Sequence, residues 1–113
     1  MLGDPRTRPT AVFAASDEIA IGVILAAREL GLSVPEDLSV IGIDDHPLAE
    51  LFGLTSIRQD PPQQGELAVA LILEALAAGS RGEETPPARH TTIPASLVIR
   101  TSTSVPRGAR IGA

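Results

Sequence analysis

Two short acidic stretches, Ser16-Asp17-Glu18 and Asp44-Asp45-His46, each follow an apolar segment and could do chemistry. Grouped carboxylates can bind magnesium or calcium through oxygen, act as general acid and base, or accept hydrogen bonds from a polar ligand. The same residue types also cap helices and form turns, and these roles account for most acids at such positions. Caps and turns are therefore favoured over catalysis, and ligand recognition stays open as a third interpretation.

Other catalytic and cofactor motifs are absent from the sequence. The chain has no cysteine, which excludes disulfides and thiolate sites. It has no Gly-x-Ser-x-Gly elbow, Gly-x-Gly-x-x-Gly turn or Walker-type loop. The two histidines, His46 and His90, are too few to indicate a triad or a metal site, so turn and surface roles are expected. We predict a protein without cofactor, metal or catalytic residues, and not an enzyme.

Composition and charge limit the partners of the chain. Leu, Ile, Val and Phe make up 32 of 113 residues, which is enough for a packed core. The net charge is −5 and the nine basic residues, all Arg, are scattered, whereas a phosphate backbone requires a clustered positive face. The longest apolar run, Leu67 to Leu73, is far shorter than the roughly 20 residues that cross a bilayer. We expect no nucleic-acid contact by this segment, no membrane, and a cytoplasmic location.

The elements that must position the acidic stretches alternate between strand-like and helix-like patterns. The apolar runs Thr10–Ala15 and Leu38–Ile43 are typical of strands buried on both faces of a parallel sheet. Capping residues and apolar stripes predict helices over 17–30 and 61–78, with a short helical piece over 48–52. Further extended pieces are predicted at 55–58, 90–93 and 96–101, a surface loop at 79–89 and an irregular tail from 105. This order predicts an α/β fold whose ligands bind beyond the carboxyl ends of the strands.

Four blocks of the sequence resemble the LacI/GalR family of bacterial transcriptional regulators. The blocks are AVFAASDEIAIG at 11–22, LGLSVPEDLSVIGIDD at 30–45, LTSIRQD at 54–60 and PASLVIRTST at 94–103. They occur in family order and at near-family spacing, and the resemblance covers about residues 9 to 104. It implies a parallel-sheet, periplasmic-binding-protein-like sensor of two lobes, with a small sugar-like effector in the cleft between them.

The resemblance also implies a division of the chain and roles for particular residues. Residues 10–58 and about 96–104 would belong to the C-terminal lobe and about 60–94 to the N-terminal lobe, after a lead-in at 1–9 and before a tail at 105–113. Asp44 matches an effector-contacting Asp, and Gln59 matches a cleft-facing Gln at a crossover. Ser16 stands where several members have an effector-binding Asn, and Ser makes fewer hydrogen bonds. Asp17 matches the following acid, which we interpret as a helix cap.

Dimer pairing and missing segments follow from the same resemblance. Ile21 and Phe52 match positions on the surface through which C-terminal lobes form homodimers. The family's DNA-binding headpiece, the N-terminal lobe's own strands and the first strands of the C-terminal lobe have no counterpart here, so the chain is expected to be a C-terminal part of the sensor. Operator DNA would then be a partner of the full-length protein alone. Two alternatives stay open: a periplasmic-type sugar-binding transport protein and, less favoured, an enzyme.

Overall fold

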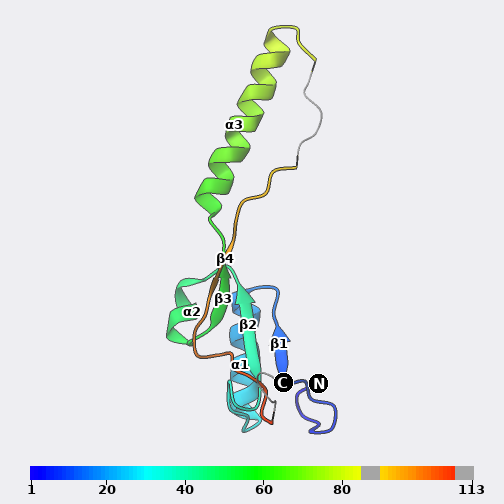
Figure 1. Cartoon of the computed structure of the whole chain (residues 1–113), viewed down its shortest axis with the longest axis vertical. Coiled ribbons are helices and arrows are strands. Elements are labelled where there is room, and N and C mark those ends of the chain that lie inside the picture. Colours follow the sequence, from blue (N-terminus) through cyan, green and yellow to red (C-terminus); the bar gives the residue numbers. More distant parts are fainter. Residues whose placement is uncertain (85–89, 109–113) are drawn as a thin grey trace. The chain divides into compact units, whose positions relative to one another are not determined.

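The computed structural model describes residues 1–84 and 90–108 and contains one four-stranded sheet (Figure 1). The predicted loop over 79–89 and the predicted tail from 105 lie partly outside the described residues. The elements in chain order are β1 (Ala11–Phe13), α1 (Asp17–Glu29), β2 (Ser39–Ile43), α2 (Pro47–Leu51), β3 (Thr55–Arg58), α3 (Pro61–Ser80) and β4 (Ser96–Val98).

The sheet is mainly parallel, which confirms the predicted α/β class. Its order is β1-β2-β3-β4, with β1, β2 and β3 parallel and β4 antiparallel to β3. The reversal of β4 follows from the chain path, because the chain leaves β3 at Arg58 and re-enters the sheet opposite it at Ser96. The predicted extended piece at 90–93 is not a strand.

The chain forms two compact units. Unit 1 comprises Met1–Gln59 and the chain from Ser96 onward, and unit 2 comprises Asp60–Ala95. The core of unit 1 is built from small and branched apolar side chains. Its buried members are Ala14, Ala20, Ile21, Ile24, Ala27, Leu38, Val40, Ala49 and Leu54.

Helix α1 forms as its sequence pattern predicts. The side chain of Ser16 caps it by accepting the amide of Ile19 at 3.3 Å, which satisfies one of the unpaired N–H groups of the first turn. Its buried apolar residues recur at spacings of one, three and three and therefore share one face, which packs against β2. Gly31 adopts a φ of 72° just after the helix, as expected for a left-handed terminating residue.

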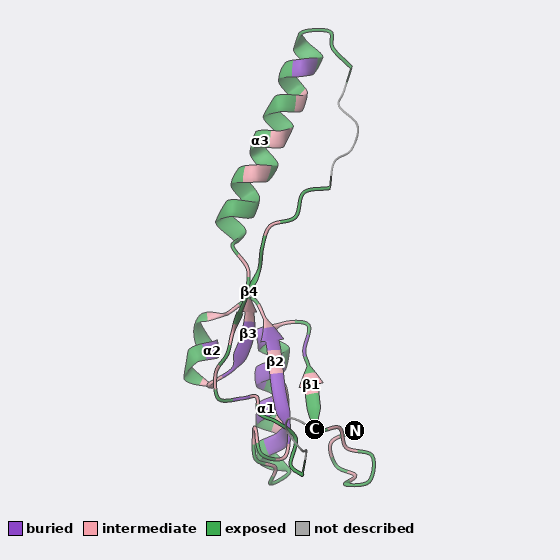
Figure 2. Ribbon diagram, viewed as in Figure 1, coloured by how far each residue is buried: buried purple, intermediate pink, exposed green. Residues whose placement is uncertain are grey.

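Strand β1 departs from the prediction that it is buried on both faces. Val12 packs against the core, but Ala11 is exposed and Phe13 is 60% exposed (Figure 2). The two helices of unit 1 supply their buried residues to the same core, so Phe13 and its register partner Ile41 lie on the other face. A continuous apolar run therefore identified the strand but not what covers it.

Unit 2 is dominated by helix α3, which begins at the predicted cap. The carboxylate of Asp60 accepts the amide of Gln63 at 3.0 Å, and prolines occupy the first turn. Half of its apolar stripe is exposed, with Ile72 58% and Leu76 63% exposed, and the other half is half-buried. Among the described residues, no helix combines the length and apolar character that a bilayer crossing needs.

Candidate functional site

Asp44 and Asp45 follow β2 in an unusual backbone conformation. Their φ angles are 110° and 53°, in the region that side chains other than glycine rarely adopt. Asp is among the residues that tolerate this region best. Such conformations persist only where neighbouring groups hold them, and they gather at ligand-binding sites.

Three consecutive amides of this loop are held by hydrogen bonds. The amide of Asp44 donates to the carbonyl of Ile57 at 2.9 Å, and the amide of Asp45 donates to Ser56 Oγ at 3.0 Å. The amide of His46 donates to Asp17 Oδ2 at 2.7 Å. The loop is therefore fastened to β3 and to the start of α1. These bonds fix the backbone from which the Asp44 side chain extends.

The structure brings Asp44 and Gln59 together. The side-chain amide of Gln59 donates from Nε2 to Asp44 Oδ1 at 3.0 Å. Asp44 is exposed and Gln59 is half-buried, and both follow the carboxyl ends of neighbouring parallel strands. A carboxylate offers acceptors only, while an amide can donate and accept, so the pair presents chemistry suited to ligand hydroxyl groups.

Ser16 stands at the same edge of the sheet, after β1, but its hydroxyl is occupied by the helix cap. Within residues 1–84 and 90–108, no hydrogen bond joins Ser16 to Asp44 or Gln59. The part predicted for Ser16 in ligand binding stays a prediction.

The prediction that Asp17 caps α1 is wrong. Ser16 is the cap, and Asp17 is fully buried as the first helical residue. Its Oδ1 accepts from Ser56 Oγ at 2.7 Å, and its Oδ2 accepts from the amide of His46. The carboxylate packs over Gly42, where any Cβ would collide with it. Asp17 therefore ties α1, β3 and the loop after β2 together from the inside.

The acidic stretches do not assemble a metal site in the described part of the chain. No group of three or more metal-ligating side chains occurs there. The oxygens of Asp17 are already used by protein donors, and those of Asp45 face arginines.

The partners of Asp45 were missed by sequence reasoning. Arg58 approaches Asp45 Oδ2 at 2.8 Å from Nε and 2.7 Å from Nη2, and Arg100 Nη2 lies 2.7 Å from Oδ1. The hydrogen bond from Arg100 lowers the pKa of Asp45 most, burial raises the pKa by less, and Arg58 lowers it further. Arg58 is 13 residues from Asp45 and Arg100 is much farther along the chain, so no local pattern connects Asp45 with either arginine.

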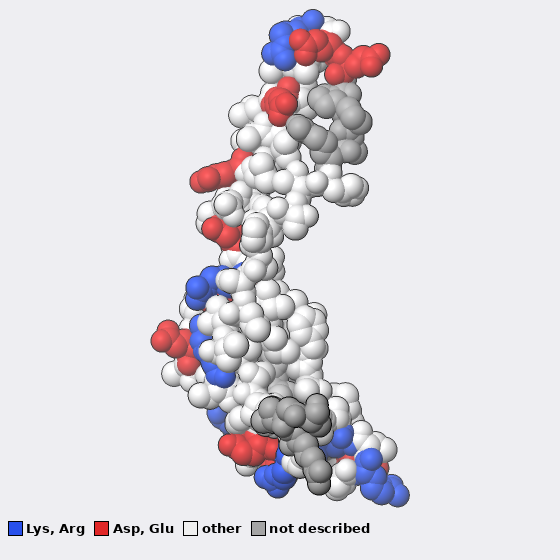
Figure 3. All heavy atoms as spheres, viewed as in Figure 1, with Lys and Arg blue, Asp and Glu red and all other residues white. Residues whose placement is uncertain are grey.

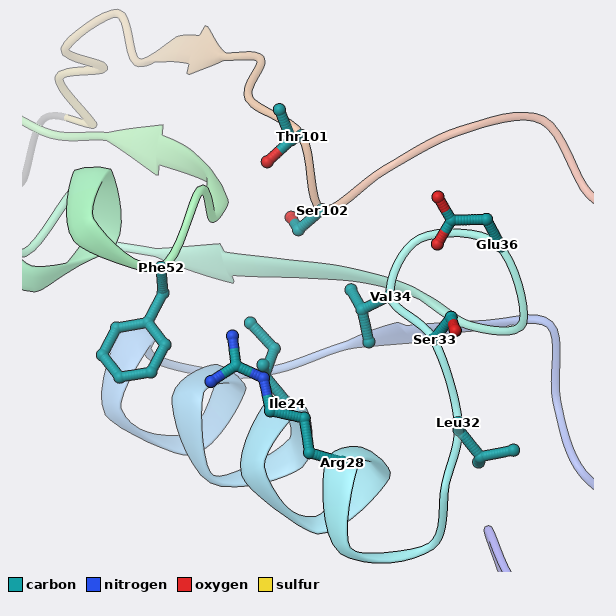
Figure 4. A pocket seen from close by; sticks show the side chains of 9 residues that line it. All are labelled: Ile24, Arg28, Leu32, Ser33, Val34, Glu36, Phe52, Thr101 and Ser102. Carbon is teal, nitrogen blue, oxygen red and sulfur yellow. The ribbon is translucent and has the colours of Figure 1, made fainter.

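The residues predicted for dimer pairing lie in α1 and at the end of α2. Ile21 belongs to the core and is only 9% exposed, while Phe52 is half-buried with the guanidinium of Arg28 5.8 Å from its ring centre. Beside Phe52 lies a pocket of about 340 Å³ (Figure 4). It is lined by Ile24, Arg28, Leu32, Ser33, Val34, Glu36, Phe52, Thr101 and Ser102. The residues that line this pocket come from the second half of α1 and from later segments of the chain, whereas Ser16 and Asp17 lie at the start of α1.

Charge does not gather into a nucleic-acid surface on the face seen in Figure 3. Arginines and acidic residues occur there in several small separate groups, with no broad basic patch. This distribution agrees with the net charge of −5.

Comparisons with known proteins agree with this architecture. Residues 2–103 match the family described as periplasmic binding protein-like domain. The chain is 43% identical over 103 residues to the HTH-type transcriptional regulator MalR of Streptomyces coelicolor, covering 89% of this chain and 28% of the relative. It is 45% identical over 80 residues to the repressor PurR of Yersinia enterocolitica, covering 69% of this chain and 24% of the relative. The chain therefore spans under a third of the length of these curated relatives.

Solved structures give the same result. A LacI family regulator from Mycobacterium smegmatis superposes with a TM-score of 0.73 at 34% identity, over 93% of this chain and 37% of that one. A LacI family regulator from Lactobacillus casei with bound sucrose gives 0.68 at 34% identity, over 88% of this chain and 35% of that one. This chain belongs to the periplasmic binding protein-like domain family, and within it to the LacI/GalR group of transcriptional regulators.

Proposed function

We propose that this chain forms part of the effector-binding domain of a LacI-type regulator. In this proposal a small sugar-like molecule contacts the chain and controls DNA binding by a headpiece outside it. The chain itself contacts no DNA and catalyses no reaction, and the complete protein acts on operator DNA in the cytoplasm.

The hydrogen-bonded pair of Asp44 and Gln59 is the observation that carries the proposal. Asp44 Oδ1 is engaged by Gln59, and no hydrogen bond to its Oδ2 occurs among the described residues. The exposed carboxylate can therefore accept hydrogen bonds from ligand hydroxyls. Asp17 and Asp45 are more buried, so a ligand would reach their carboxylates only at a cost in free energy. The Lactobacillus casei regulator, which has bound sucrose in one structure and glucose in another, supports a sugar as the ligand class.

Homodimer formation is the second part of the proposal. A lac repressor with an 11-residue C-terminal deletion, 35% identical with a TM-score of 0.68 over 87% of this chain and 35% of that one, is dimeric. We propose that the surface around Phe52, with Ile21 behind it, pairs with a second copy.

The alternative, a sugar-binding transport protein of periplasmic type, shares the fold but is less favoured, because the relatives reported above are transcriptional regulators. The decisive experiment titrates mono- and disaccharides calorimetrically into the complete gene product that contains residues 1–113. We expect one sugar to bind and to change operator affinity measured in the same preparation. Sugar binding without any change in DNA binding would favour transport, and no binding to any sugar would contradict the proposal.

A further inference from the structure

One carboxylate of unit 1, that of Asp45, lies between two arginines, one at the end of β3 and one after β4. Arg58 ends β3, and the chain passes into unit 2 two residues later at Asp60. Arg100 follows β4, which begins where the chain returns from unit 2 at Ser96. Asp45 is also the direct neighbour of Asp44, so the same carboxylate touches the end of β3 and the segment after β4 and adjoins the candidate ligand contact.

The contacts are close, and the contact with Arg58 also has hydrogen-bond geometry. Asp45 Oδ2 binds Arg58 at 2.7 and 2.8 Å, and Oδ1 faces Arg100 Nη2 at 2.7 Å. Arg100 is fixed further, because its Nη1 donates to the carbonyl of Leu54 at 2.8 Å and its amide donates to Thr55 Oγ1 at 2.9 Å. The segment after β4 is therefore held on β3 and on the loop after β2 at once.

Of the three charged residues Asp45, Arg58 and Arg100, Asp45 is the one whose loss is expected to disturb the ion pairs most. The Asp45 side chain is 11% exposed and that of Arg100 is 19% exposed, so both charges are largely removed from water. Removing the carboxylate would leave two guanidinium groups that repel each other, one of them mostly buried. By contrast, Arg58 is 56% exposed and can return to solvent when it is released.

The backbone conformation indicates a second role for Asp45, besides its ion pairs with the two arginines. Residues 44 and 45 both have positive φ, which persists only when surrounding contacts impose it. The Asp45 ion pairs supply such contacts from the side-chain direction, in addition to the backbone bonds to Ile57 and Ser56.

We propose that Asp45 is a positioning residue for Asp44: its carboxylate fastens the loop that carries Asp44 to the end of β3 and to the segment after β4. A change in either segment is thereby transmitted to Asp44. The role assigned to Asp44 rests on the proposed function, whereas the fastening itself is a property of this chain and is tested without a ligand.

The test measures amide hydrogen exchange by NMR on the 113-residue chain and its variants. In Asp45→Asn we expect the amides of residues 44–46 and 100–102 to exchange about tenfold faster, because charged hydrogen bonds that close the loop are lost. The amides in the middle of α1 should change much less. Asp4→Asn is the matched control, since Asp4 also pairs with an arginine in unit 1, Arg6, but in an exposed local turn; it should leave residues 44–46 unchanged.

Two further variants keep the test decisive if Asp45→Asn does not fold. Arg58→Gln leaves the pair with Arg100 intact and should speed exchange at residues 44–46 without affecting 100–102. Arg100→Gln should speed exchange in both places. Equal acceleration of every amide, or no selective change at residues 44–46 in any of these variants, would overturn the proposal.

Affinity then separates this inference from the proposed function. With a sugar that binds the complete gene product, Asp45→Asn should weaken binding about tenfold, the factor expected when a charged contact no longer orders its neighbour, and Asp4→Asn should not. If selective loop opening occurs but no sugar binds the unaltered protein, the positioning role stands and the proposed function fails. If a sugar binds and affinity and exchange are both unchanged in Asp45→Asn, the positioning role fails alone.

Discussion

The two acidic stretches at the carboxyl edge of the sheet are alike in composition but opposite in environment. After β1, Asp17 is fully buried, and both of its oxygens accept hydrogen bonds from within the protein. After β2, Asp44 is exposed, its backbone has positive φ, and its carboxylate meets the side chain of Gln59. A carboxylate whose oxygens are satisfied inside a fold maintains that fold, whereas one held at the surface is available to a ligand.

Asp17→Ala is the substitution with the largest expected effect. This substitution leaves the buried hydroxyl of Ser56 and the amide of His46 without their acceptor, so we expect a loss of about 3 kcal/mol in the free energy of unfolding. Urea unfolding followed by circular dichroism measures it. A loss near 1 kcal/mol would instead match a simple helix-capping role.

The opposite outcome is expected for Asp44→Ala. We expect effector affinity in the complete gene product to fall by about 2 kcal/mol, the scale of a hydrogen bond to a charged group. The free energy of unfolding should fall by only about 1 kcal/mol, because alanine removes no buried bond but tolerates a φ of 110° less well than aspartate. A variant that binds normally but unfolds early would make Asp44 a turn residue only.

Gly42→Ala tests the space that Asp17 needs. A Cβ at residue 42 collides with the Asp17 carboxylate and also crowds the backbone of Asp17 and the side chain of Ala20. We expect a loss of about 1–2 kcal/mol in the free energy of unfolding, as for overpacked cores. Gly22→Ala is the control, because its Cβ would meet nothing within 4 Å; equal effects at the two positions would contradict the packing described for Asp17.

Ser16→Ala should have a smaller effect. Loss of the hydrogen bond to the amide of Ile19 is expected to cost about 1 kcal/mol of stability. Ser16→Asn should retain the cap and, if Ser16 faces the ligand, should increase effector affinity. Thermal melts and calorimetry on the pair distinguish the two roles, and a Ser16→Ala protein as stable as the unaltered chain would exclude the cap.

The smallest effect concerns pH. The pKa of Asp45 is lower in the folded chain than its usual value, mainly because Arg100 donates to the carboxylate. Its stabilisation is therefore complete above the unfolded pKa of about 4 and is lost as pH falls through the folded pKa. We expect the stability difference between the unaltered chain and Asp45→Asn to be constant at neutral pH and to shrink below about pH 4. A difference that is the same on both sides of that range would contradict the ion pairs.

Local signals predicted much of this fold, and non-local contacts account for what they missed. Capping residues and apolar spacing were enough for α1 and α3, because both are short-range properties of a helix. The exposure of Phe13 depends on which elements cover the second face of the sheet, which a strand pattern does not encode.

The candidate site likewise contains residues that the sequence predicted and contacts that it could not predict. Asp44 and Gln59 were named from family resemblance, and the structure places them in contact. The burial of Asp17 and the pairing of Asp45 with Arg100 were not predictable, because their partners come from segments far along the chain. A glycine facing an acid across the core, as Gly42 faces Asp17, is visible only once the fold is known.

The most direct test of the distinction between the two acidic stretches is a crystal structure of the complete gene product with its sugar bound. We expect the Asp44 carboxylate within hydrogen-bond distance of ligand hydroxyl groups, and Asp17 still bonded to Ser56 and His46. A ligand bound elsewhere with Asp44 facing only solvent, or a ligand in contact with Asp17, would contradict the roles assigned to these two carboxylates.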